Sequence, residues 1–181
     1  MNSVLENLIK QDSDFSESKF KSKVENIFVQ IKLSMVTGKT EKIHHFVNEE
    51  TYSKILQKVE DDKNNNRIQL YDELNVADIQ IVNIEELDDS FKIEVRLHSK
   101  ALEYYISRDK RKFISGNKNS RTERMNRLVF TKIKDSKDMG VARKCPSCGA
   151  NIDVNKDGQC SYCGNIFNLQ NYDWVVSYMD I

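Results

Sequence analysis

The stretch Phe91-Lys92-Ile93-Glu94-Val95-Arg96-Leu97-His98 has the clearest pattern in the chain. Apolar and polar side chains alternate along it without a break, which is typical of a β-strand with one buried face and one wet face. The turn-forming residues Asp88-Asp89-Ser90 come directly before it and predict a connection to an earlier strand. We therefore expect an antiparallel sheet whose apolar face is covered by other elements.

Weaker strand patterns lie on both sides of this stretch. Residues 79–84 alternate with one slip, which predicts a strand that contains a β-bulge. A strand that is broken or bulged near Ala101 is expected to run through residues 104–106, and another to cover residues 124–133. A last strand is predicted at 172–179, and its alternation puts three side chains on one face: Trp174, Val176 and Tyr178.

Helical patterns fill the part of the chain before the strands. Ser16 can cap a helix that ends at Gly38, and its apolar residues recur at spacings of three and four: Phe20, Val24, Ile27, Phe28, Ile31 and Met35. A second helical region follows Thr40. Asn48 can cap a third helix, which ends in the polar run 63–66. Residues 1–14 carry a short amphipathic pattern that predicts one or two further helical turns.

The four cysteines of the chain form two CxxC pairs, each followed by glycine. Thiolates two residues apart can bind one ion together, and the glycine lets the backbone turn back toward the sulfurs. The pattern predicts one structural zinc ion in a small ribbon, in which Asp157-Gly158 forms the turn of a hairpin that includes Ile152 and Val154. Iron, a redox role, or two disulfides in an exported protein are the alternatives. The predicted ligands are Cys145, Cys148, Cys160 and Cys163.

The place of the cysteines in the chain predicts how the ribbon is attached. They lie between the expected strands 124–133 and 172–179. A terminal strand this aromatic needs a sheet to pair with, and the strand just before the ribbon is its neighbour in sequence. We therefore expect the ribbon to be inserted in the last β-hairpin. A closed four-thiolate site leaves no open position for chemistry, so its role should be structural.

Composition indicates a soluble globular protein. The chain has 181 residues, of which 39% are hydrophobic, and no apolar run exceeds three residues. The first residues lack the basic and apolar regions of a signal peptide. We expect a cytoplasmic location, which agrees with cysteines paired for metal rather than for disulfides.

The charges are balanced overall but unevenly spread. The chain has 28 basic and 28 acidic residues, whereas residues 107–127 alone carry eight basic and two acidic ones. This segment is either an ordinary solvated loop or a surface for anionic lipid, phosphate, an acidic protein or, as a weaker alternative, nucleic acid. Between Cys145 and Gly164 the net charge is −1, which argues against nucleic-acid binding by the ribbon. The candidate surface residues are Arg108, Lys110, Arg111, Lys112, Lys118 and Arg121.

The chain resembles bacterial proteins of the Tim44-like family, which share the C-terminal domain of a subunit of the mitochondrial inner-membrane import translocase. The resemblance covers the chain from about Phe15 to its end. The segments that carry it are Phe20 to Phe28, Tyr104-Tyr105, Ser115-Gly116 ahead of Thr122-Glu123, Leu128 to Lys132, and Tyr172 to Val176.

This resemblance implies an α+β fold in which N-terminal helices pack on a curved antiparallel sheet, a cone of the nuclear transport factor two-like type, with an apolar cavity under the sheet. Mitochondrial relatives tether an import motor and touch cardiolipin-rich membrane. Aromatic side chains on the strands are the expected cavity lining, although such residues more often form core. The four candidates are Tyr104, Tyr105, Trp174 and Tyr178.

The sequence therefore predicts a non-catalytic protein-interaction or adaptor module, cytoplasmic or peripheral to a membrane, with an unidentified protein partner. A small-ligand-binding or catalytic cone domain is the alternative, but Asp78, Glu85 and Glu94 are all expected on wet faces. The histidines are expected to be ordinary surface residues. Three regions are predicted: an N-terminal extension (1–14), a cone domain (15–140 plus 170–181) and an inserted zinc ribbon (141–169).

Overall fold

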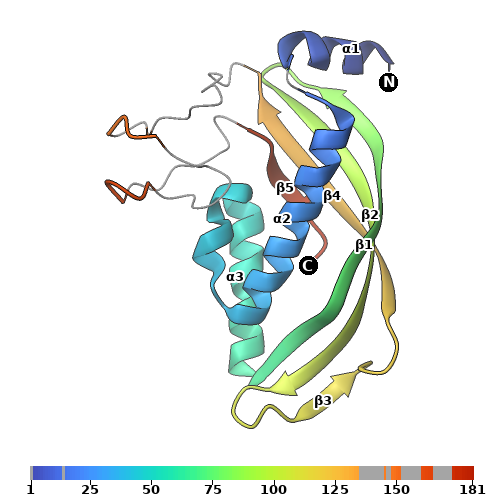
Figure 1. Ribbon diagram of the computed structural model, residues 1–181, viewed down its shortest axis with the longest axis vertical. Helices are drawn as coiled ribbons and strands as arrows, with labels where there is room; N and C mark the ends of the chain where they lie inside the picture. Colours follow the sequence, from blue (N-terminus) through green and yellow to red (C-terminus); the bar gives the residue numbers. More distant parts are fainter. Residues whose placement is uncertain (1, 14, 135–144, 146–147, 152–159, 165–172) are drawn as a thin grey trace.

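Two long helices, α2 and α3, lie along the concave face of a curved antiparallel sheet (Figure 1). The computed structural model describes residues 2–13, 15–134, 145, 148–151, 160–164 and 173–181. In chain order the described elements are α1 (Asn2–Gln11), α2 (Glu17–Thr37), the 3₁₀ helix η1 (Thr40–Phe46), α3 (Glu49–Asn64), β1 (Arg67–Glu86), β2 (Ser90–Ser107), β3 (Phe113–Gly116), β4 (Thr122–Ile133) and β5 (Val175–Met179). The predicted α+β class is confirmed.

The helix ends follow the capping residues that the sequence predicts. The Ser16 side chain accepts a hydrogen bond from the Lys19 backbone N–H at 3.2 Å, and Asn48 accepts one from Thr51 at 2.9 Å. The Gly38 N–H donates to the Ser34 carbonyl at the end of α2. The helical region after Thr40 is the 3₁₀ helix η1, a short connector between the two long helices.

The sheet has the strand order β1-β2-β4-β5, and β3 also pairs with β2. The bulge predicted in residues 79–84 is confirmed by a register shift between Ile81 and Asn83. The break predicted in the second strand near Ala101 is wrong, because β2 runs unbroken from Ser90 to Ser107. The irregularity lies opposite, on β1, where Glu73 adopts a positive φ of 53° and the register shifts between Asp72 and Asn75.

The last two strands form the expected hairpin, since β5 pairs antiparallel with β4 and the cysteines lie between them in the chain. One prediction on β5 is wrong. Trp174 and Val176 are buried, but the register slips between Val129 and Phe130 and turns the next side chain to the other face. Tyr178 is therefore 36% exposed, whereas Met179 is 3% exposed and takes its place in the core.

The core lies between α2 and the inner face of the sheet. Phe20 on α2 contacts Phe130 on β4 and Trp174, with ring centroids 5.3 and 5.4 Å apart in edge-to-face geometry. The N-terminal helix α1 docks on this core through the fully buried Leu8. The predicted ribbon hairpin, with Ile152, Val154 and Asp157-Gly158, lies outside the described residues.

Candidate functional site

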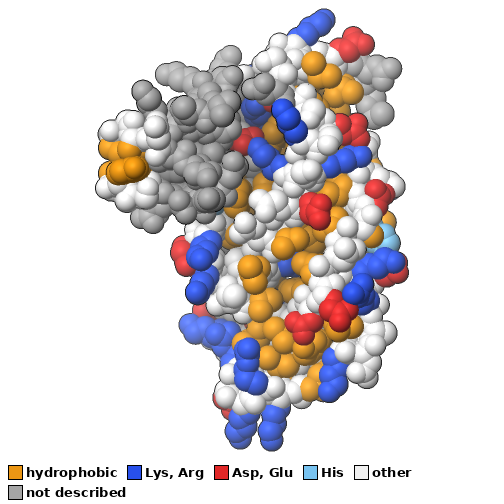
Figure 2. Space-filling view, in the orientation of Figure 1, with side chains coloured by type: hydrophobic (Ala, Val, Ile, Leu, Met, Phe, Trp, Pro, Cys, Tyr) orange, Lys and Arg blue, Asp and Glu red, His pale blue; other side chains and the backbone are white. Residues whose placement is uncertain are grey.

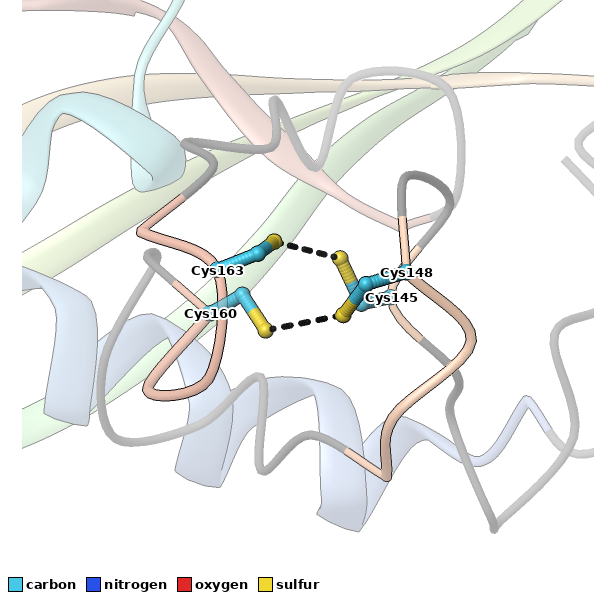
Figure 3. Close-up of side chains that lie close together, drawn as sticks. All are labelled: Cys145, Cys148, Cys160 and Cys163. Atoms are coloured by element: carbon cyan, nitrogen blue, oxygen red, sulfur yellow. Dashed lines mark hydrogen bonds between the residues drawn. The ribbon is translucent and has the colours of Figure 1, made fainter.

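The four cysteines come together from two loops, as predicted. Their Sγ atoms all lie within 4.8 Å of one another. The Sγ atoms of Cys145 and Cys163 are 3.6 Å apart, and those of Cys148 and Cys160 are 3.7 Å apart (Figure 3). Each loop therefore contributes one sulfur to each close pair, so the two loops face each other across a common centre.

The two loops have the same backbone geometry. The Gly149 N–H donates to the Cys145 carbonyl at 2.8 Å, and the Gly164 N–H donates to the Cys160 carbonyl at the same distance. Both glycines have a φ of 72°, in the left-handed region that side chains disfavour. The glycine after each CxxC pair thus closes the turn that directs both thiols toward the same point.

The sulfur separations fit a metal site rather than disulfides. A disulfide would bring two sulfurs to about 2.05 Å, whereas a tetrahedral zinc ion with Zn–S bonds of about 2.3 Å needs sulfurs about 3.8 Å apart. No disulfide joins any of the four cysteines, and Cys145 and Cys160 are buried while Cys148 and Cys163 are exposed. The cluster is able to bind a metal ion, and four thiolates would fill a tetrahedral coordination shell.

The six basic candidates divide into two groups. Arg121 is bound to Glu73, with Nη2 and Oε2 2.6 Å apart, and the Lys118 ammonium lies over the Phe113 ring. The other four lie exposed in the turn between β2 and β3, and no described residue forms an ion pair with any of them: Arg108, Lys110, Arg111 and Lys112. We call residues 108–114 the basic tip, because β3 adds the half-exposed Phe113 and Ile114 to these cations.

The four aromatic candidates do not lie together. Trp174 belongs to the core cluster with Phe20. Tyr178 lies on the outer face of the sheet under the Arg127 guanidinium. Tyr104 donates a hydrogen bond to Asp72 at 2.5 Å, whereas Tyr105 lines a pocket on the helix side of the sheet and donates to Gln69 at 2.9 Å. Only Tyr105 of the four lines this pocket in the described part of the chain.

The acidic and histidine side chains follow their expected places with one exception. Asp78 and Glu85 are exposed, and Glu94 pairs with Arg127, which lowers the pKa of that carboxyl by hydrogen bonding. His44 stacks on Tyr52 and contacts Glu49 at 2.9 Å. The prediction that the histidines are surface residues is wrong for His45, which η1 turns into the core against Phe46.

Two charged residues that were not predicted as site residues lie between the helices and the sheet. Lys32 continues the row Phe20, Val24 and Phe28 at a spacing of four, so the helical period itself places it on the buried face of α2. Glu103 occupies an inward position of β2 and binds Arg124, with Nη2 and Oε2 2.8 Å apart. Both residues line the pocket that Tyr105 lines. The sequence pattern that could have predicted their burial is a charged residue at a position where the helix or strand period places inward-facing side chains.

No helix in the described ranges is both long enough and apolar enough to cross a membrane.

Comparison with known protein families gives a match over the first three quarters of the chain. A family model described as the Tim44-like domain matches residues 1–140. A search of curated proteins gave no match. The matched segment includes both long helices and strands β1 to β4 and ends before the cysteines.

Proposed function

The chain belongs to the Tim44-like domain family, and from this membership we propose that it is a non-catalytic adaptor that holds a protein partner at an anionic membrane surface. The family suggests a membrane-associated or protein-interaction module. In this proposal the adaptor is cytoplasmic and peripheral, and residues 15–140 plus 170–181 form its cone domain. Residues 1–14 extend it, and residues 141–169 form an inserted zinc ribbon.

The observation that carries the proposal is the basic tip. Four cations without ion pairs among the described residues lie in the turn directly before two half-exposed apolar residues of β3. Lys and Arg near an anionic surface each contribute about 1 kcal/mol of attraction, and apolar side chains at the boundary add burial. Figure 2 shows the matching pattern, with Lys and Arg side chains gathered at the end of the molecule where β3 lies. Phosphate on nucleic acid would use the cations but not the apolar pair.

Gly116 explains why the tip keeps its shape. It pairs with Tyr104 of β2 at a φ of 102°, and a Cβ atom there would lie 2.6 Å from the Glu103 carbonyl oxygen. Only glycine permits this close approach of β3 to β2. The short strand is thereby attached to the sheet, and Phe113 and Ile114 remain next to the cations of the turn.

Vesicle flotation tests the membrane part of the proposal. The chain should float with vesicles of phosphatidylcholine and phosphatidylglycerol but not with phosphatidylcholine alone. Binding should weaken as salt rises, because the Debye length falls from about 10 Å at 0.1 M to about 3 Å at 1 M. Reversal of four charges (Arg108→Glu, Lys110→Glu, Arg111→Glu, Lys112→Glu) should abolish it.

A matched control reverses four exposed lysines elsewhere: Lys10→Glu, Lys19→Glu, Lys39→Glu and Lys42→Glu. This variant has the same net charge as the tip variant and should still bind anionic vesicles. If both variants lose binding equally, only net charge matters and the tip is not the surface. Absence of flotation at low salt would remove the membrane part, and a DNA mobility shift lost in the tip variant alone would assign the tip to nucleic acid.

The ribbon supplies the protein-binding part of the proposal. One zinc ion held by Cys145, Cys148, Cys160 and Cys163 would fold a segment too small to bury a core of its own. The metal would have only this structural role, since the four thiolates occupy every position of a tetrahedral site. Tyr162 lies between two of the ligands and is 76% exposed, which is unusual for so large an aromatic side chain.

Two measurements test the ribbon. Elemental analysis should give one zinc per chain, and none in the variant Cys145→Ser, Cys148→Ser. A pull-down should then compare this variant with Tyr162→Ser, which keeps all four ligands. A partner lost from both variants binds the ribbon surface. A partner that binds the cysteine variant as well as the wild type would place the contact elsewhere.

A further inference from the structure

A pocket of about 360 Å³ lies between α2, α3 and the helix-facing side of the sheet. Its size is at the lower end of the range of about 300–1,000 Å³ that small-molecule sites occupy. Its wall combines apolar side chains, such as Phe28 and Leu74, with amide and hydroxyl groups of Gln69 and Asn126. A few convergent polar groups in an apolar hollow are what such sites use to orient a ligand.

Lys32 is the decisive residue of this pocket. It is 9% exposed, and its ammonium lies 4.6 Å from the centre of the Tyr71 ring and 5.6 Å from that of Phe28. No described residue forms an ion pair or a hydrogen bond with it. A buried ammonium without an anionic partner is costly, because burial removes its hydration. Burial accordingly lowers the pKa of Lys32 to about 8.

The other charged groups around the pocket have partners of their own. Glu103 is bound to Arg124, and Lys58 to Asp62. Asp180 is exposed, and its carboxylate accepts one hydrogen bond from the Arg127 backbone N–H at 3.0 Å and another from the Tyr178 hydroxyl at 2.9 Å. Lys32 is thus the one charged group of this wall, within the described chain, that a ligand would have to neutralise.

We propose that this pocket binds a small monocarboxylate with an aromatic or aliphatic body, whose carboxylate pairs with the Lys32 ammonium. A single ammonium matches a single negative charge, whereas a phosphate dianion is normally held by several cations or by a bidentate arginine. Tyr71 lines the same pocket as Lys32. Burial raises the pKa of its phenol, so the hydroxyl stays protonated and can donate a hydrogen bond. The body of the ligand would lie against Leu74, Met125 and Phe28.

The competing explanation is that Lys32 needs no ligand. The Tyr71 ring attracts the ammonium, and the Glu103 carboxylate raises its pKa from a distance. In that case the lysine is only a structural plug. The two explanations differ in whether a carboxylate binds and whether its charge matters.

Calorimetric titration separates them, with phenylacetate and octanoate as probes and with phenylacetamide and octanol as their uncharged counterparts. Wild-type protein should bind a carboxylate probe with a stoichiometry of one, and at least ten times more tightly than its uncharged counterpart. Lys32→Met should lose this preference, while the exposed-lysine control Lys54→Met should keep it. Equal binding of acid and amide, unchanged binding by Lys32→Met, or no binding of either carboxylate would each overturn the proposal.

A measurement on the wild-type chain removes dependence on the folding of the variant. The Cε resonance of Lys32, assigned by its absence in Lys32→Arg, should shift when phenylacetate is added and should titrate at a higher pH. A resonance that stays in place under saturating probe would also overturn the proposal. The pocket does not depend on the proposed adaptor role, because vesicle and partner binding use the basic tip and the ribbon.

Discussion

The inner face of the sheet has two halves built from the same strands and covered by the same helix. The apolar half consists of Ile93, Val95 and Leu97 on β2 with Leu128 and Phe130 on β4, and all five are fully buried. The polar half continues along both strands with Ser99, Glu103, Tyr105, Arg124 and Asn126. The strand alternation is the same in both halves, so the pleat decides which side chains point inward, and their chemistry decides whether they form a core or a pocket.

The largest difference between the halves should appear when a core side chain is truncated. Phe130→Ala removes a fully buried ring that contacts Phe20, and it should destabilise the fold by about 3–5 kcal/mol in urea unfolding. Val129→Ala is the control, since this neighbour faces the other side of β4 and is only half-buried. Its expected cost is about 1 kcal/mol or less. Equal losses for both variants would show that the apolar half is not the main core.

In the polar half, removal of the Lys32 charge should stabilise the fold, whereas truncation of Phe130 in the apolar half destabilises it. Lys32→Met keeps the apolar stem and removes an ammonium whose pKa burial lowers to about 8. At about 1.4 kcal/mol per pKa unit, the shift from 10.5 to about 8 should make the variant more stable by about 3 kcal/mol at pH 7. The exposed Lys54→Met should change stability by less than about 0.5 kcal/mol. A destabilised Lys32→Met would mean that the Glu103 and Arg124 pair depends on the lysine charge.

The same lysine gives the polar half a pH dependence that the apolar half lacks. The folded pKa of Lys32 is lowered to about 8 from 10.5, so above pH 8 the unfolded chain binds more protons than the folded one. The penalty of the buried charge therefore decreases as pH rises from 8 toward 10.5. Relative to Lys32→Met, the wild type should gain about 1.3 kcal/mol of stability between pH 7 and pH 9. A constant difference across this range would mean that Lys32 titrates normally.

The apolar half was predictable from sequence, and the polar half was not. The alternation of residues 91–98 and the helical period from Phe20 to Ile31 are local patterns, and each element keeps them in the fold. The cysteine spacing was equally informative, because two CxxC pairs, each followed by glycine, are typical of a metal site, and the four thiols do cluster in the fold. The caps at Ser16 and Asn48 also depend only on neighbouring residues.

What could not be predicted depends on contacts between elements. A one-residue slip between β4 and β5 turned Tyr178 outward, and neither strand shows that slip by itself. The irregularity expected near Ala101 lies on the partner strand, at Glu73. The burial of Lys32 was visible in the helical period, but the pocket required Glu103 and Arg124 to be placed opposite it. Sequence periods assign a face, whereas pairing and register assign neighbours.

The smallest expected effect tests whether the polar half is open to water. Tyr105→Phe removes the hydroxyl that donates to the Gln69 side chain at 2.9 Å. In a sealed core the unpaired Gln69 oxygen would cost about 1–3 kcal/mol, but water that enters the pocket can replace the donor and hold the loss near 0.5 kcal/mol. Tyr104→Phe is the control, because its hydroxyl bonds Asp72 at an exposed position. If both variants lose the same small amount in urea unfolding, the pocket is hydrated, whereas a loss of 2 kcal/mol or more for Tyr105→Phe alone would make the polar half a closed core.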